Sequence, residues 1–201
     1  MFVQVIRGRT TDPAALHEAF GTWVRDLSPG AEGWLGSTGG VTADGRVVVL
    51  ARFASPDDAR RNSERPEQDA WWQETSRLIA DPVFADAKQV TTYLGAGSDD
   101  AGFVQVIHGS TTDPGRLLDT IERLSTNLRV FRHEIIGGTV TLHHDHTYTE
   151  AVYFTSLEAA REGEQRRLPP ELQGAMDRMQ EYTSLVAYYD LTDPWLYSPK
   201  A

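Results

Sequence analysis

The chain has 201 residues, of which 40% are hydrophobic and 9% aromatic, which is enough apolar material for a packed core. Its net charge of −10 argues against nucleic acid as a partner, because phosphate binding needs clustered positive charge, and the lack of cysteine excludes disulfides and thiolate metal ligands. No apolar run is long enough to cross a bilayer and no leader peptide is visible, so we expect a cytoplasmic protein without a membrane partner.

The first predicted elements are a strand and a helix. Residues 2–9, "FVQVIRGR", are rich in β-branched side chains and predict a strand. Asp12 and Pro13 then supply a helix N-cap and a favoured first helical residue. Apolar residues follow at helical spacing, namely Leu16, Phe20, Trp23 and Leu27.

Two more strands, a second helix and a final strand are expected next. Asp44-Gly45 lies between two apolar runs and predicts a hairpin with a type I′ turn. Ser55-Pro56 predicts the start of the second helix, and "VTTYL" at residues 90–94 predicts the last strand. This order of elements is that of a ferredoxin-like βαββαβ unit.

The second half of the chain repeats the first. "FVQVIRGRTTDP" from Phe2 recurs as "FVQVIHGSTTDP" from Phe103, and "RFASPDDAR" from Arg52 recurs as "YFTSLEAAR" from Tyr153, both at an offset of 101 residues. Asp113-Pro114 again predicts a helix start. The chain is therefore expected to contain the same unit twice.

Two glycine pairs and one linker fix the expected repeat boundaries. Gly39-Gly40 matches Gly137-Gly138 at an offset of 98, which predicts three extra residues in the second copy. "GAGSDDAG" at residues 95–102 is the one linker-like stretch. We therefore expect one repeat over residues 1–97 and another over residues 98–201.

A ferredoxin-like sheet carries helices on one face only, so its other face must be covered. We expect an α+β fold in which two fused ferredoxin-like repeats pack their antiparallel sheets together and close an intrachain barrel. The strand-to-helix passages "RFASPDDAR" and "YFTSLEAAR" resemble those of the dimeric α/β-barrel superfamily, in particular its antibiotic biosynthesis monooxygenase-like domains. The resemblance covers nearly the whole chain, but its members include monooxygenases, haem-degrading enzymes, decarboxylases, isomerases and non-catalytic binders.

The lumen of such a barrel is the expected ligand site. Strand alternation places Gln4 and Gln105 in it, because their small β-branched neighbours suit the helix-covered face better. The same alternation points Arg52 and Tyr153 into the lumen, opposite the phenylalanines that follow them. In the alternative interpretation, the two glutamines hydrogen-bond each other or water and have no role beyond satisfying polar groups in the interior.

Residues 60–75, "RRNSERPEQDAWWQET", are the most individual stretch. The resemblance implies that Asn, Trp, Tyr and Arg side chains position a polycyclic phenol without a cofactor. Arg52, Asn62 and Tyr153 are the candidate donors that stabilise a developing anion, and Trp71 and Trp72 are candidate substrate-binding residues. Alternatively, one tryptophan fills the core and the other lies half exposed.

Five of the six histidines lie in the second half. His108 replaces Arg7 at the end of the strand and is a candidate base near the lumen. "LHHDHTYTE" resembles a metal site, but His143 and His144 are adjacent and point to opposite faces of a strand. With His146 they are therefore expected to form a solvated hairpin loop without a metal.

No cofactor is expected either. Haem-degrading relatives combine an Asn on the first strand with a His on a helix, whereas the first strands here carry Gln4 and Gln105, and neither second helix has a His. Three functions stay open. They are a cofactor-independent monooxygenase acting on an aromatic or polyketide-type small molecule, a non-catalytic hydrophobic-ligand-binding or stress-related barrel, and an interaction protein with a filled barrel.

The C-terminal segment is too apolar for a free tail. Asp193-Pro194 ends the last strand, and Trp195, Leu196 and Tyr197 are expected to dock on the body, against the first half. Because an intrachain barrel covers both sheets, we expect a monomer with a pseudo-twofold axis or a weak homodimer.

Overall fold

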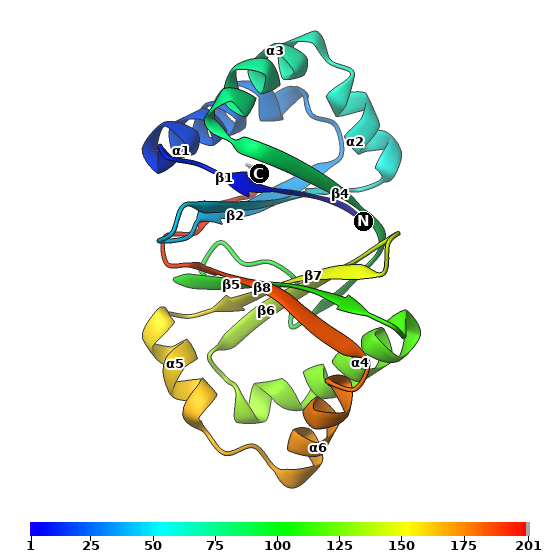
Figure 1. Cartoon of the computed structure of the whole chain (residues 1–201). Coiled ribbons are helices and arrows are strands. Elements are labelled where there is room, and N and C mark those ends of the chain that lie inside the picture. The colour runs from blue at the N-terminus through cyan, green and yellow to red at the C-terminus, as the bar shows by residue number, and fades with distance from the viewer. Residues whose placement is uncertain (200–201) are drawn as a thin grey trace. The chain divides into compact units, whose positions relative to one another are not determined.

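The computed structural model describes residues 1–199, without the side chain of Arg129, as two compact units (Figure 1). The first unit contains residues 1–87 and the segment from residue 193 onward, and the second contains residues 88–192. These bounds differ from the repeat boundary expected after residue 97, because the end of each repeat belongs to the other unit. None of the helices in the described chain has the length and hydrophobicity that a bilayer crossing requires.

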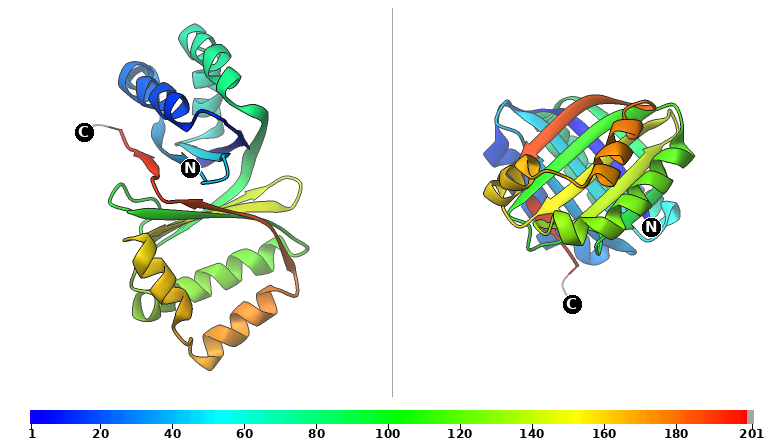
Figure 2. Two further views of the ribbon diagram at one scale, coloured as in Figure 1. Left: turned by 60° about the vertical axis from the view of Figure 1, so that its left-hand side comes forward. Right: turned by 90° about the horizontal axis from the view of Figure 1, so that it is seen from below.

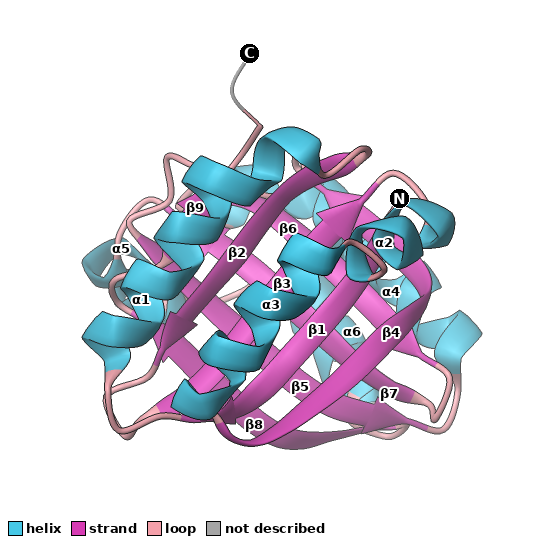
Figure 3. Ribbon diagram, turned by 90° about the horizontal axis from the view of Figure 1, so that it is seen from above, coloured by secondary structure: helices cyan, strands magenta, loops and turns pink. Residues whose placement is uncertain are grey.

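The first unit has helices on one face of its strands, as Figure 3 shows for α1, α2 and α3. Its elements are β1 (Phe2–Arg9), α1 (Pro13–Thr22), the π-helical turn η1 (Trp23–Leu27), the 3₁₀ turn η2 (Ser28–Gly30), β2 (Trp34–Val41), β3 (Arg46–Phe53), α2 (Pro56–Ser63), α3 (Pro66–Thr75), η3 (Ser76–Leu78), the first part of β4 (Ala80–Tyr93) and β9 (Trp195–Tyr197). Strand β1 pairs antiparallel with β3 and with β4.

The second unit has the same order of elements and also has helices on one face, as the view from below in Figure 2 shows. It contains the end of β4, β5 (Phe103–Thr111), α4 (Pro114–Phe131), β6 (Ile135–His143), β7 (Thr147–Phe154), α5 (Leu157–Gln165), α6 (Pro170–Met179) and β8 (Thr183–Leu191). In the described chain the nine strands follow the hydrogen-bonded order β8-β5-β7-β6-β4-β1-β3-β2-β9, an open antiparallel sheet. The fold is therefore α+β with two ferredoxin-like units.

Three predicted helix starts are confirmed by side-chain caps. The Asp12 and Asp113 carboxylates each accept the backbone N–H of the residue three positions later, at 3.0 Å, and Ser55 does the same at 3.1 Å. Each cap satisfies a backbone donor that the first helical turn leaves unpaired.

The predicted hairpin at Asp44-Gly45 is present, but its predicted type I′ turn is wrong. That turn needs positive φ at both central residues. Gly45 has φ +81°, whereas Asp44 is not among the described residues with positive φ. The Asp44 carboxylate instead accepts hydrogen bonds from Thr42 and Arg46, the residues on either side of the turn.

The strand register corrects the match of the glycine pairs. Ser37 lies opposite Ala51 in the first unit, and Gly138 lies opposite Val152 in the second. The offset of 101 residues therefore continues through both hairpins, and the predicted three-residue insertion between these blocks is wrong. Position 138 corresponds to Ser37, because strand pairing and not local identity sets the register.

The predicted docking of the C-terminal segment is confirmed. Strand β9 lies beside β2 (Figure 3) and pairs antiparallel with it, with Trp195 opposite Gly39. The Trp195 ring is buried and stacks on His17 of α1, with 4.8 Å between ring centroids. This strand completes the core of the first unit.

Candidate functional site

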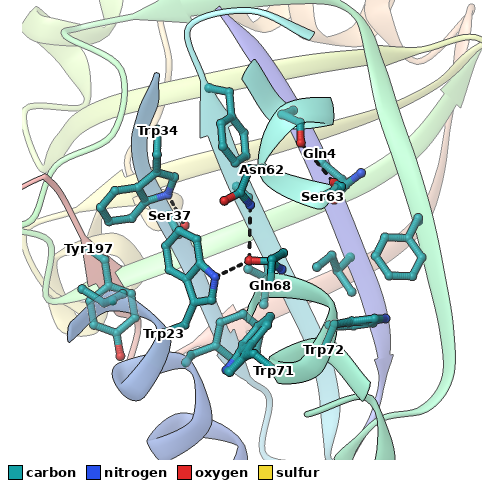
Figure 4. A pocket seen from close by; sticks show the side chains of 18 of the residues that line it. Gln4, Trp23, Trp34, Ser37, Asn62, Ser63, Gln68, Trp71, Trp72 and Tyr197 are labelled. Carbon is teal, nitrogen blue, oxygen red and sulfur yellow. Dashed lines mark hydrogen bonds between the residues drawn. The ribbon is translucent and has the colours of Figure 1, made fainter. Parts of the chain in front are cut away.

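A cavity of about 260 Å³ lies between the helices and the sheet of the first unit (Figure 4). Strands β1, β2, β3, β4 and β9 supply its floor, and α1, η1, α2 and α3 supply its other walls. Aromatic side chains dominate the lining, in particular Trp23, Trp34, Trp71, Trp72, Phe20 and Phe84. We call it the tryptophan cavity.

The helix that carries Trp23 changes its winding at that residue. Helix α1 ends at Thr22 and continues as the π-helical turn η1, a form that is rare and is often found at functional sites. The Trp23 ring meets Trp34 edge to face, with 5.2 Å between centroids. Trp71 is fixed from the other side, because its Nε1 donates to the backbone oxygen of Ala19 at 3.0 Å.

An amide cluster lies among these rings. The Oε1 atom of Gln68 accepts from Trp23 Nε1 at 2.5 Å and from Asn62 Nδ2 at 3.3 Å (Figure 4). An indole N–H can only donate, so it fixes which end of the Gln68 amide is the oxygen. Arg65 donates to Asn62 Oδ1 at 3.0 Å and fixes that amide in the same way. The Gln68 NH₂ group has no hydrogen-bond partner among the described residues.

These features together can hold a planar molecule that carries an oxygen. Indole and phenyl faces pack against aromatic rings, and an amide NH₂ without a partner can donate to a carbonyl or phenolate oxygen. Tyr197 also lines the cavity. Burial, followed by the charges of Glu18 and Asp193, raises the pKa of Tyr197, so its hydroxyl stays protonated.

The predicted placement of Gln4 and Gln105 in a lumen is wrong. Both lie on the helix-covered face of their strands and line cavities there. Gln4 donates to Asp86 Oδ1 at 3.0 Å, and Gln105 donates to Asp190 Oδ1 at 2.9 Å. The helices stand off the sheet, so the larger residues Phe2 and Ile6 fill that gap and the small valines take the other face.

Three predicted residues from α2 and α3 do come together. Asn62, Trp71 and Trp72 line the tryptophan cavity together with Gln4. Both tryptophans are half-buried, so neither is simply a core plug with an exposed partner. Their roles in binding substrate stay predictions.

The predicted donor cluster of Arg52, Asn62 and Tyr153 is not brought together in the first unit. Arg52 lies on the face of β3 away from the helices, where it donates to Thr38 Oγ1 at 2.8 Å, whereas Asn62 lies on the helix side. Tyr153 belongs to the second unit, on the face of β7 away from the helices. The placement of Arg52 and Tyr153 opposite the neighbouring phenylalanines is confirmed.

Four histidines of the second unit divide into two groups, and the solvated loop expected for His143 is wrong, because His143 ends β6 with a buried side chain. His108 and His143 are buried, and both contact Thr149 Oγ1, at 3.3 Å and 3.0 Å. His144 and His146 are exposed at the β6–β7 turn. No group of three or more His, Cys, Asp or Glu side chains suited to a metal ion occurs in the described part of the chain. The role of His108 as a base stays a prediction.

Sequence reasoning missed Gln68, Trp34 and Tyr197 as parts of one site. Gln68 and Trp23 lie 45 residues apart and meet only in the folded unit. Tyr197 reaches the cavity because β9 pairs with β2. The one signal in the sequence was the concentration of tryptophan in the first half.

No family model matches the sequence, and no curated protein matches it significantly. Solved structures do resemble it. A candidate monooxygenase from Lactobacillus acidophilus is 12% identical over 98% of this chain and 92% of its own, with a TM-score of 0.69. An anthrone oxidase-like protein is 11% identical over 98% and 90% of the two chains, with a TM-score of 0.64. A haem-binding protein from Thermus thermophilus is 8% identical over 98% and 90%, with a TM-score of 0.53.

These identities are too low to carry function, and they show the fold. The chain shares the ferredoxin-like α+β fold of monooxygenase-related structures, as the motifs at the strand-to-helix passages predicted.

Proposed function

We propose that the chain binds an aromatic or polyketide-type small molecule in the tryptophan cavity and oxidises it as a cofactor-independent monooxygenase. The observation that carries the proposal is the Gln68 amide, which is oriented by Trp23 and has an NH₂ group free to meet a ligand oxygen. The likeness to a candidate monooxygenase and to an anthrone oxidase-like protein supports the reaction class.

The chemistry needs a ligand that loses a proton to become an enolate or phenolate. The NH₂ groups of Gln68 and Asn62 stabilise the negative charge on the ligand oxygen, and the aromatic walls exclude water. The carbanion form of the ligand reduces O₂. A ring CH₂ group becomes a carbonyl with one oxygen atom of O₂, and the other oxygen leaves as water with the two hydrogens.

The alternative function is a non-catalytic carrier of a hydrophobic ligand. Among the described residues that line the tryptophan cavity, the ionisable groups are Asp69, which is exposed, and Tyr197. Neither is a buried carboxylate suited to removing a proton. This observation favours binding without turnover for ligands that do not ionise by themselves.

Anthrone is a suitable probe, because its enol form is a phenol and its oxidation product is anthraquinone. Anthrone added under nitrogen should quench the tryptophan fluorescence, and admitting air should then consume one O₂ for each anthraquinone formed. Quenching without O₂ uptake above the spontaneous rate would support the carrier. Absence of quenching would contradict the site itself.

The matched variants are Gln68→Glu and Gln73→Glu, both on α3. Gln68→Glu keeps an acceptor for Trp23 but removes the NH₂ donor and adds negative charge, so turnover should fall by about 100-fold. Gln73 is exposed and does not line the cavity, so its variant should keep the rate.

We further propose that the chain acts as a monomer in which the two sheets close one barrel. Sedimentation velocity tests the monomer, and small-angle scattering tests the closure. A stable dimer at low concentration would contradict the first part of this proposal.

A further inference from the structure

The second unit contains a larger cavity, of about 590 Å³, beneath α4, α5 and α6. Small-molecule sites commonly have volumes of about 300–1,000 Å³. Its walls are mainly aliphatic, with Ile121, Leu128, Val152, Leu172, Met176 and Met179 among them. Glu150 of β7 also lines it, and we call it the carboxyl cavity.

Glu150 occupies a position where the fold otherwise places an apolar side chain. It shares the helix-covered face of β7 with Val152 and Phe154, and the equivalent residue of the first unit is the buried Val49. A carboxylate among apolar side chains is costly unless it is hydrogen-bonded. Burial raises the pKa of Glu150, and a hydrogen bond from Tyr93 works in the opposite direction.

Tyr93 holds one oxygen of this carboxyl group. Its hydroxyl donates to Glu150 Oε1 at 2.7 Å. Burial, followed by the charge of Glu150, raises the pKa of Tyr93 well above its usual value, so the hydroxyl stays a donor. Gly138 provides the room, because a Cβ atom at that position would lie 1.9 Å from Cζ of the Tyr93 ring.

The other charged groups of this wall are already paired with opposite charges. Arg161 donates to Glu164 at 2.9 Å and also bonds Asp190, which accepts from Gln105. Arg132 bonds Glu134. Among the described residues, Tyr93 is the one hydrogen-bond partner of the Glu150 carboxyl group. The second carboxyl oxygen is therefore available to a molecule in the cavity.

We propose that the carboxyl cavity is a second ligand site, separate from the tryptophan cavity, for an apolar molecule of the phenol class whose hydroxyl donates to Glu150. A hydroxyl needs one acceptor, which the second carboxyl oxygen supplies. An ammonium group has three N–H donors to satisfy, and the neighbouring carboxylates of Glu164 and Asp190 are already bonded to Arg161. The aliphatic walls fit the rest of the molecule.

The two cavities can be observed separately. The chain has five tryptophans, and all of them lie in the first unit, at positions 23, 34, 71, 72 and 195. Tryptophan fluorescence therefore reports on the first unit, whereas titration calorimetry detects binding in either cavity.

The probes are para-hexylphenol and its methyl ether, para-hexylanisole, which lacks the hydroxyl donor. By calorimetry the phenol should bind the wild-type chain, and Glu150→Gln should weaken that binding by about tenfold, because a hydrogen bond to a charged acceptor becomes one to a neutral amide. The anisole should bind weakly and equally to both chains. Any change in tryptophan fluorescence on adding either probe should be the same in the wild type and in Glu150→Gln.

A second variant, Leu172→Phe, narrows the cavity from α6 and should remove the part of the phenol's binding heat that depends on Glu150. Equal affinity of the wild-type chain and Glu150→Gln for the phenol overturns the proposal. So does a binding heat of the phenol that is equal in all three proteins and follows the tryptophan quenching, since the probe then binds in the first unit alone. Neither result bears on the anthrone test of the tryptophan cavity.

Discussion

The tryptophan cavity and the carboxyl cavity occupy the same place in two units with the same order of elements, yet they present different chemistry. In the first unit, Ser37 accepts a hydrogen bond from Trp34 at 3.1 Å and Val49 fills the floor. In the second, the corresponding positions are Gly138 and Glu150. Gly138 makes room for the Tyr93 ring, and the Glu150 carboxyl group accepts a hydrogen bond from the Tyr93 hydroxyl.

The helices above the two floors differ as well. In the first unit α1 has 10 residues and gives way to a π-helical turn that carries Trp23, whereas α4 of the second unit runs for 18 residues. The wall of the first cavity therefore contains the Trp23 indole. The wall of the second cavity is instead formed by a longer helix with aliphatic side chains. The comparison teaches that a few side chains facing the helices decide the chemistry of this fold, while the sheet beneath stays the same.

The largest effect is expected from moving the carboxyl group into the wrong cavity. Val49→Glu buries a carboxylate beside Ser37, where the second unit has the Gly138 that makes room for Tyr93, and it should lower the free energy of unfolding by about 3 kcal/mol at neutral pH. The loss should shrink as the pH falls, because protonation removes the buried charge. Urea unfolding measures both.

The control for that change is Val49→Gln, which has the same size without the charge. If both variants are equally destabilised at neutral pH, the first cavity excludes glutamate at position 49 because of its shape and not because of its charge. The chemical contrast drawn here between Val49 and Glu150 would then be wrong.

A middle-sized effect is expected at Gly138. A Cβ atom there collides with the Tyr93 ring, so Gly138→Ala should lower the free energy of unfolding by about 2 kcal/mol and release the Glu150 carboxyl. The matched control is Gly115→Ala in the first turn of α4, where the nearest atom to the new Cβ is 3.8 Å away. That change should be neutral or stabilising by up to about 1 kcal/mol. Equal stability of the two variants would show that Tyr93 moves at no cost.

The smallest effect concerns the pH dependence of stability. Because the folded chain raises the pKa of Glu150, it binds that proton more tightly than the unfolded chain does. The contribution of Glu150 to stability is therefore fully present below its unfolded pKa and is lost as the pH rises through the folded value. Glu150→Gln removes this loss. As the pH rises, the free energy of unfolding of the variant should therefore increase relative to that of the wild type, by about 1.4 kcal/mol for each unit of pKa shift.

Other titrating groups face the same cavity and are common to both proteins, so the difference isolates Glu150. They are Tyr93 on β4, Arg132 after α4, Arg161 and Glu164 on α5, and Tyr188 and Asp190 on β8. Tyr148 of β7 does not line the cavity, but burial and then the charge of Glu150 raise its pKa. A difference in stability that does not change with pH would place the folded pKa of Glu150 at its ordinary value.

Local signals predicted the elements well. The caps at Asp12, Ser55 and Asp113 each bond a backbone group within one helical turn, so a short stretch of sequence is enough to predict them. The sequence did not show which face of each strand lies under the helices. Alternation places Gln4 and its neighbours on opposite faces, but it does not say which face the helices cover. The distance between helix and sheet decides that, and it is a property of the assembled unit.

The candidate sites were predictable in the same uneven way. Asn62, Trp71 and Trp72 lie close together in the sequence and were found, whereas Gln68 acquires its orientation from Trp23 across a tertiary contact. Glu150 did leave a visible signal, as a charge in an otherwise apolar alternation. Its meaning stayed hidden because its partner comes from the other half of the sequence.

The pairing of β2 with β9 has a consequence for how the protein is made. Most of the chain lies between these two strands, whereas the second unit is a continuous segment, residues 88–192. A chain leaving the ribosome from its N-terminus therefore finishes the second unit first and keeps β2 as an unpaired edge meanwhile. We expect the first unit, with its tryptophans, to acquire its final core last, although it begins to be synthesised first.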